Sequence, residues 1–141
     1  MKTIIDKFQE YYFNEGKGFI SEEKLLIDPA IIENLSRKYK LAVFTGRPRK
    51  EAAFILERTG LLKYFSYIIA MEDVPEGKGK PDPHGIDDIC GKFCTRNALF
   101  IGDMPDDISA GKAAKMDCIG ILPPQDKSEE LRKILMDRGA I

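Results

Sequence analysis

The sequence lacks several features that mark specialised classes of protein. It has no tryptophan, a single histidine and three cysteines in 141 residues. An odd number of cysteines forms no even disulfide framework, and the formal net charge of -1 gives no basic surplus for binding nucleic acids or membranes. No apolar run approaches the ~20 residues of a membrane-spanning helix, and the N-terminus lacks a signal-peptide core. We therefore expect a cytoplasmic protein with no nucleic-acid partner and no membrane partner.

What the sequence does contain indicates a single folded domain over residues 1–141. With 43% hydrophobic residues the chain is globular, and its length allows a substantial core. Short apolar runs alternate with helical patterns, which predicts an α/β fold with a parallel sheet and helices on both faces. Helices are expected at residues 3–14, 29–38, 49–58, 83–93, 105–114 and 128–138. Strands are expected at residues 41–44, 67–70, 99–101 and 119–122.

A cluster of carboxylates follows the strand at residues 99–101. Gly102 and Asp103 end this strand, and Asp106 and Asp107 lie in the first turn of the helix that follows. In open α/β sheets ligands bind at the carboxyl ends of the strands, and two carboxylates with water are a usual Mg2+ site. The alternative is that these acids only cap the helix, where negative charge is favoured.

A hydroxyl and a glycine follow the strand at residues 41–44. Thr45 can donate a hydrogen bond to a phosphate oxygen, and Gly46 lets the main chain approach an anion closely, at the positive end of the next helix. Arg47 is a further candidate ligand for phosphate, with a solvated turn arginine as an equal alternative. On its own, the loop also fits an ordinary turn between a strand and a helix.

A lysine lies on the loop after the strand at residues 67–70. Lys80 precedes a helix start formed by Asp82 and Pro83, and it follows a strand end as Thr45 and Asp103 do. Lys78 is a rival candidate, because the glycines around both lysines allow either side chain to turn inward.

These three motifs in this order resemble the haloacid dehalogenase (HAD) superfamily of phosphohydrolases, in the subfamily IA branch, whose cap follows the first strand. The resemblance implies a Rossmann-like core. It implies that Thr45 binds phosphate and that Lys80 steadies the nucleophile and the phosphate charge. It also implies that Asp103 and Asp107 hold Mg2+, with Asp106 as the alternate second acid. The likeness covers about residues 25–122.

The sequence departs from this family at its first motif. Members begin with a strand that ends in Asp-x-Asp, where the first acid attacks phosphorus and the second transfers protons, but this chain contains no Asp-x-Asp. Residues 1–6 have a faint likeness to such a strand, with Asp6 as the nucleophile, but Phe8 stands where the second acid is needed. Apolar residues at helical spacing instead predict an amphipathic helix over residues 3–14. Residues 1–20 then resemble a remnant of the last cap helix and its linker.

The chain therefore resembles a truncated HAD core without its first, central strand and without most of its cap. The expected activity is Mg2+-dependent hydrolysis of a small phosphorylated molecule. Without a nucleophile, turnover by the chain alone is not expected. A second chain or a homo-oligomer is expected to fill the gap in the sheet. The alternative is a non-catalytic remnant that binds phosphate and metal, or that serves in assembly.

Overall fold

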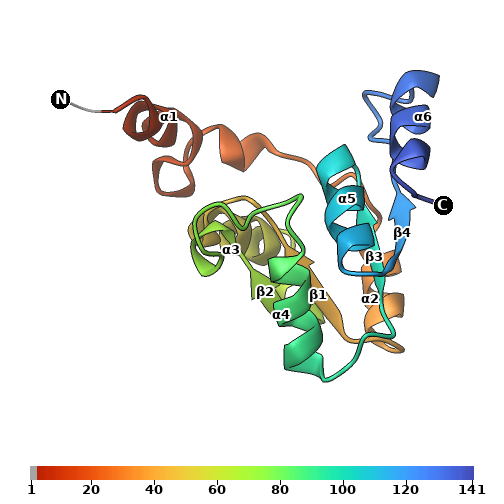
Figure 1. Ribbon diagram of the computed structural model, residues 1–141. Coiled ribbons are helices and arrows are strands. Elements are labelled where there is room, and N and C mark those ends of the chain that lie inside the picture. The colour runs from red at the N-terminus through yellow and green to blue at the C-terminus, as the bar shows by residue number, and fades with distance from the viewer. Residues whose placement is uncertain (1–2) are drawn as a thin grey trace. The chain divides into compact units, whose positions relative to one another are not determined.

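The computed structural model describes residues 3–141, which form two compact units, residues 3–70 and residues 71–141. In Figure 1 the first unit runs from red to yellow-green and the second from green to blue. Among residues 3–141, no helix has the length and apolarity that crossing a membrane requires.

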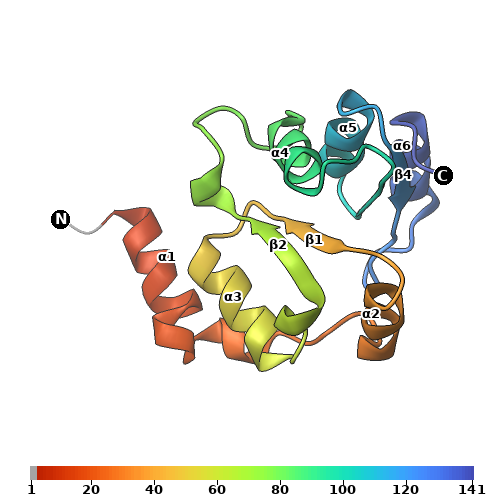
Figure 2. The ribbon, with the colours of Figure 1, turned by 90° about the horizontal axis from the view of Figure 1, so that it is seen from below.

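The first unit contains a two-stranded parallel sheet. Strands β1 and β2 pair through Val43 with Ile68 and through Phe44 with Ile69, and Figure 2 shows them side by side. The α-helices and strands of this unit are α1 (Ile4–Tyr12), α2 (Pro29–Ser36), β1 (Leu41–Phe44), α3 (Arg49–Arg58) and β2 (Phe65–Ile69). Short 3-10 helices occupy Asn14–Gly16, Phe19–Glu22 and Leu62–Tyr64.

The amphipathic helix predicted at the N-terminus is confirmed as α1. Thr3 and Asp6 form a capping box, in which the Asp6 N–H donates to Thr3 Oγ1 at 3.1 Å and the Thr3 N–H donates to the Asp6 carboxylate at 2.8 Å. This arrangement satisfies two of the unpaired donors at the helix start. Asp6 is thus part of a helix cap, while Met1 and Lys2 of the alternative strand lie outside the described residues.

The second unit contains the other parallel pair, in which Phe100 of β3 lies opposite Cys118 of β4. Its α-helices and strands are α4 (His84–Phe93), β3 (Leu99–Gly102), α5 (Pro105–Ala113), β4 (Asp117–Gly120) and α6 (Glu129–Asp137), with a 3-10 turn at Met71–Asp73. Ile108, Cys118 and Leu135 form the buried core between one face of the sheet and the helices α5 and α6. Gly111 permits this packing, because an added Cβ would lie 2.4 Å from Cys118 Sγ.

The α/β class and the parallel pairing are confirmed, and several details differ from the prediction. Strand β2 occupies Phe65–Ile69, where residues 67–70 were expected. The last strand occupies Asp117–Gly120, two residues earlier than predicted, because its pairing partner β3 ends at Gly102, opposite Gly120. The described strands also form two sheets of two strands instead of one continuous sheet.

Candidate functional site

The predicted site residues are divided between the two units. Thr45, Gly46 and Arg47 follow β1 in the first unit. Lys80 and the three acids at β3 belong to the second unit.

The loop after β1 holds Thr45 in a defined position. The Thr45 N–H continues the pairing with β2 by donating to the Ile69 carbonyl at 2.9 Å, and Thr45 Oγ1 accepts the Arg47 N–H at 3.2 Å. A hydroxyl that accepts one hydrogen bond still has its own proton to donate. Gly46 is exposed, and a Cβ added to it would meet no atom within 4 Å, so an anion has room over its main chain. The loop can therefore offer a hydroxyl donor beside the N-terminus of α3.

Arg47 is held in a network of side chains. Its guanidinium donates to the Tyr12 hydroxyl oxygen at 2.5 Å and to Glu23 Oε1 at 3.1 Å, while the Tyr12 hydroxyl donates to the same Glu23 oxygen. Burial acts to lower the pKa of Arg47, but the hydrogen bond and the charge of Glu23 raise it overall. Burial, and next the hydrogen bond to Glu23, raise the pKa of Tyr12. Arg47 is thus an exposed arginine whose guanidinium is paired with Tyr12 and Glu23.

A second polar contact joins α1 to the start of α3. Glu51 is only 3% exposed and accepts a hydrogen bond from Gln9 Nε2 at 2.6 Å. The Phe13 ring, just after α1, meets the Phe54 ring edge-on with 6.0 Å between centroids. Tyr12, Glu23 and Glu51 were not predicted at this position, because their partners lie 24 to 42 residues away in the chain.

In the second unit Lys80 and Asp107 form an ion pair. Lys80 Nζ lies 2.6 Å from Asp107 Oδ1, and their side chains are 21% and 9% exposed. Lys78 pairs instead with Asp82 at 3.1 Å, and its hydrogen bond is the main cause of a lowered Asp82 pKa. Asp82 also accepts the His84 N–H at the start of α4. Of the two candidate lysines, Lys80 is the one that reaches the acids after β3.

The other Asp107 oxygen closes the turn between β3 and α5. Asp107 Oδ2 accepts the N–H of Asp103 at 3.2 Å and that of Met104 at 3.1 Å. Gly102 is required at the strand end, because an added Cβ would lie 2.3 Å from the Asp107 Cβ. Asp103 and Asp106 are exposed. Asp107 is thus the acid that both Lys80 and the turn hold in place, whereas Asp106 is directed to solvent.

The donor atoms at the end of β3 suit a hard cation. Mg2+ prefers carboxylate oxygens and keeps several of its waters, so one or two carboxylates are enough to hold it. Asp103 and Asp107 are linked through the main chain at the same turn. In residues 3–141 no three His, Cys, Asp or Glu side chains converge as a metal cluster. Asp103 and Asp107 are the residues that would hold the ion, with water completing its shell.

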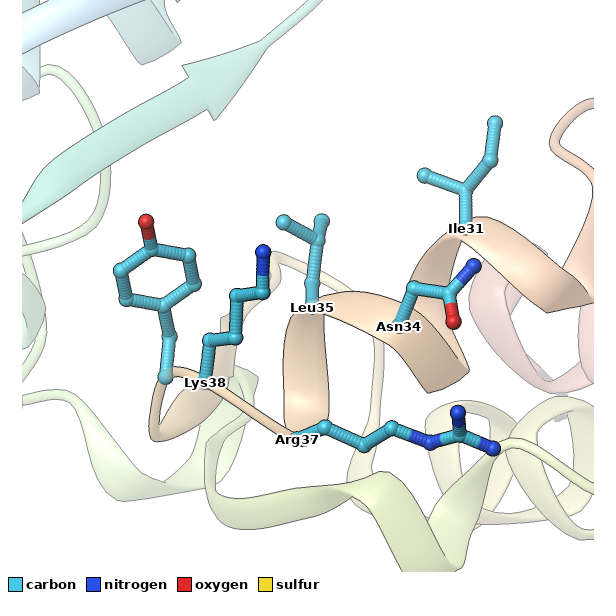
Figure 3. Close-up of a pocket in the computed structure, with 6 residues that line it drawn as sticks. Ile31, Asn34, Leu35, Arg37 and Lys38 are labelled. Carbon is cyan, nitrogen blue, oxygen red and sulfur yellow. The ribbon is translucent and has the colours of Figure 1, made fainter.

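A cavity of about 580 Å³ lies elsewhere in the first unit, over one side of α2 and the turn that follows it. Figure 3 shows Ile31, Leu35 and Lys38 directed to the same side of this segment. None of the predicted site residues lines the cavity, whose lining is Ile31, Asn34, Leu35, Arg37, Lys38 and Tyr39.

Comparison with known proteins identifies the class of this chain. The sequence profile of the haloacid dehalogenase-like hydrolase family matches residues 3–121. The chain is 30% identical over 118 residues to phosphoglycolate phosphatase of Escherichia coli, covering 81% of this chain and 45% of that enzyme. It is 31% identical over 137 residues to imidazoleglycerol-phosphate dehydratase of Phytophthora nicotianae, covering 93% of this chain and 30% of that protein.

A solved structure shares the fold. A protein from Thermotoga maritima, described as a putative beta-phosphoglucomutase, superposes with a TM-score of 0.78 at 24% identity, covering all of this chain and 65% of that one. The chain belongs to the haloacid dehalogenase-like hydrolase family. It spans less than half the length of the two curated relatives named above.

Proposed function

We propose that this chain is the phosphate- and Mg2+-binding core of a HAD-type phosphatase, acting on a small phosphorylated molecule. The observation that carries the proposal is the Lys80–Asp107 pair at the end of β3, in a chain that belongs to this hydrolase family. In the first unit we assign phosphate binding to Thr45, Gly46 and Arg47. In the second unit we assign neutralisation of negative charge to Lys80 and the holding of Mg2+ to Asp103 and Asp107.

The roles follow from the charges that phosphoryl transfer creates. The transferred group carries negative charge on its oxygens throughout, so catalysis depends on positioning and on cationic groups. Bound Mg2+ would supply further neutralisation of this charge. Asp107 holds the Lys80 ammonium, and the main-chain donors of Asp103 and Met104 fix Asp107 in turn. The ammonium is therefore oriented before any phosphate arrives.

We propose that the attacking carboxylate comes from outside these 141 residues. The sequence contains no Asp-x-Asp, and Asp6 is held in the capping box of α1. Among the described strands β3 pairs only with β4, so its other edge carries no strand. Such an edge is a template for an added strand. A second polypeptide, another segment of a longer protein, or another copy of the chain would supply that strand.

The test is hydrolysis of p-nitrophenyl phosphate with Mg2+ by the purified chain, beside Asp103→Ala and Asp6→Asn variants. We expect no turnover above the background set by Asp103→Ala. Turnover that both variants lose would identify Asp6 as the nucleophile and would overturn the proposal of an external carboxylate. If the chain neither hydrolyses the ester nor binds phosphate or Mg2+, a remnant kept for assembly becomes the better description.

A further inference from the structure

The N-terminal segment contacts the loop after β1 through a negative charge, and this charge would oppose the binding of phosphate to that loop. Arg47 lies two residues after Thr45, and its guanidinium is shared between Tyr12 of α1 and Glu23. Glu23 follows the 3-10 helix Phe19–Glu22. A negative charge therefore lies in contact with the arginine beside the proposed anion site.

The contact is neither fully buried nor fully solvated. The side chains of Arg47 and Glu23 are 43% and 33% exposed, so an anion from solvent can reach the guanidinium. A phosphate oxygen and a carboxylate oxygen have the same chemistry toward a guanidinium, since both accept charge-assisted hydrogen bonds. The two therefore compete for Arg47.

We infer that Glu23, with Tyr12, positions Arg47 and sets the anion affinity of the loop after β1, as an ionic latch that phosphate must open. The inference rests on the proposed function, and it adds a regulation of the same site. A segment or partner that removes Glu23 from Arg47 would raise the affinity for phosphate. By linkage, bound phosphate would weaken the docking of the N-terminal segment by the same factor.

Other contacts also hold α1 near the loop after β1. Gln9 donates to the buried Glu51 at 2.6 Å, and Lys50 Nζ lies 4.8 Å from the centre of the Phe13 ring. These contacts hold α1 against the start of α3 independently of Arg47. Separating Glu23 from Arg47 therefore removes the negative charge beside the guanidinium without requiring that α1 unfold.

The experiment is a titration of the full chain with inorganic phosphate, in which the melting temperature is measured at each phosphate concentration. The key variant is Glu23→Gln, because glutamine keeps an acceptor oxygen for Tyr12 and Arg47 but removes the charge. The matched control is Glu22→Gln, which removes the same charge from an exposed neighbour. Tyr12→Phe is a second variant, in which Arg47 loses one hydrogen-bond acceptor but keeps Glu23.

We expect Glu23→Gln to bind phosphate about threefold to tenfold more tightly than the wild type. Glu22→Gln should match the wild type, and Tyr12→Phe should show a smaller gain than Glu23→Gln. A residue with a purely structural role would weaken binding or leave it unchanged. Binding by the wild type with no gain in Glu23→Gln would overturn the latch and leave the proposed function standing. No binding by any of these chains would count against the proposed function and against the latch with it.

Discussion

Two lysines on one loop have very different surroundings. Lys80 reaches the buried Asp107, whereas Lys78 pairs with Asp82 at the surface. Exposed ion pairs contribute little to stability, because water and salt screen them. A buried carboxylate that loses its cation is left with an uncompensated charge.

Lys80→Ala should therefore lower the free energy of unfolding by about 2 kcal/mol, below the cost of breaking a fully buried pair because Lys80 is partly exposed. Lys78→Ala, the matched control, should cost less than about 0.5 kcal/mol. Urea unfolding of both variants measures the difference. Equal losses would mean that the Lys80–Asp107 pair is no more than a surface contact.

The three cysteines also differ in their surroundings. Burial raises the pKa of the Cys90 and Cys118 thiols, whereas Cys94 is exposed at the end of α4. Because the thiolate is the reactive form, Cys94 should react with a disulfide reagent at pH 8 roughly tenfold faster or more than the other two. Cys94→Ser should remove the fast phase. Two thiols that react together in the folded chain would contradict the burial of Cys90 or Cys118.

At the scale of elements, alanine substitutions at two helix glycines are expected to change stability in opposite directions. Gly111 of α5 packs on β4, where an added Cβ would lie 2.4 Å from Cys118 Sγ. Gly91 of α4 has open space, since its added Cβ would meet nothing within 4 Å. Glycine inside a helix is entropically costly, so its replacement by alanine helps wherever there is room.

Gly91→Ala should raise the free energy of unfolding by about 0.5 kcal/mol or slightly more. Gly111→Ala should lower it by about 1–3 kcal/mol, because the methyl group overpacks the core between α5 and β4. Chemical denaturation of the two variants in parallel checks both signs. A stabilised Gly111→Ala would mean that α5 does not pack closely on β4.

Local patterns predicted the elements well and the contacts poorly. The helix expected at residues 49–58 is α3, Arg49–Arg58, because Pro48 directly precedes it and Gly60 closely follows it in the sequence. The glycines around Lys78 and Lys80 left both lysines as candidates, and the choice of Lys80 rested on the resemblance to the HAD superfamily. The partners of Arg47 depend on packing between segments far apart in the chain, which no local pattern records. The predicted roles of Thr45, Lys80, Asp103 and Asp107 stay predictions.

At the scale of the whole molecule, the described chain carries two small parallel sheets. Parallel sheets are normally buried and extended by further strands. In β3, Leu99 and Ile101 are 50% and 47% exposed, so the face of this strand away from α5 and α6 is only half covered. The chain also spans less than half the length of the two curated relatives compared above.

The most direct measurement of the proposed site is the melting temperature of the chain in excess inorganic phosphate, with and without Mg2+. We predict that Mg2+ raises it, because an ion that binds only the folded state stabilises that state. Asp103→Asn should abolish the rise, whereas Asp106→Asn, the matched acid that points to solvent, should retain it. No Mg2+-dependent rise in the wild-type chain would contradict a phosphate- and metal-binding HAD core.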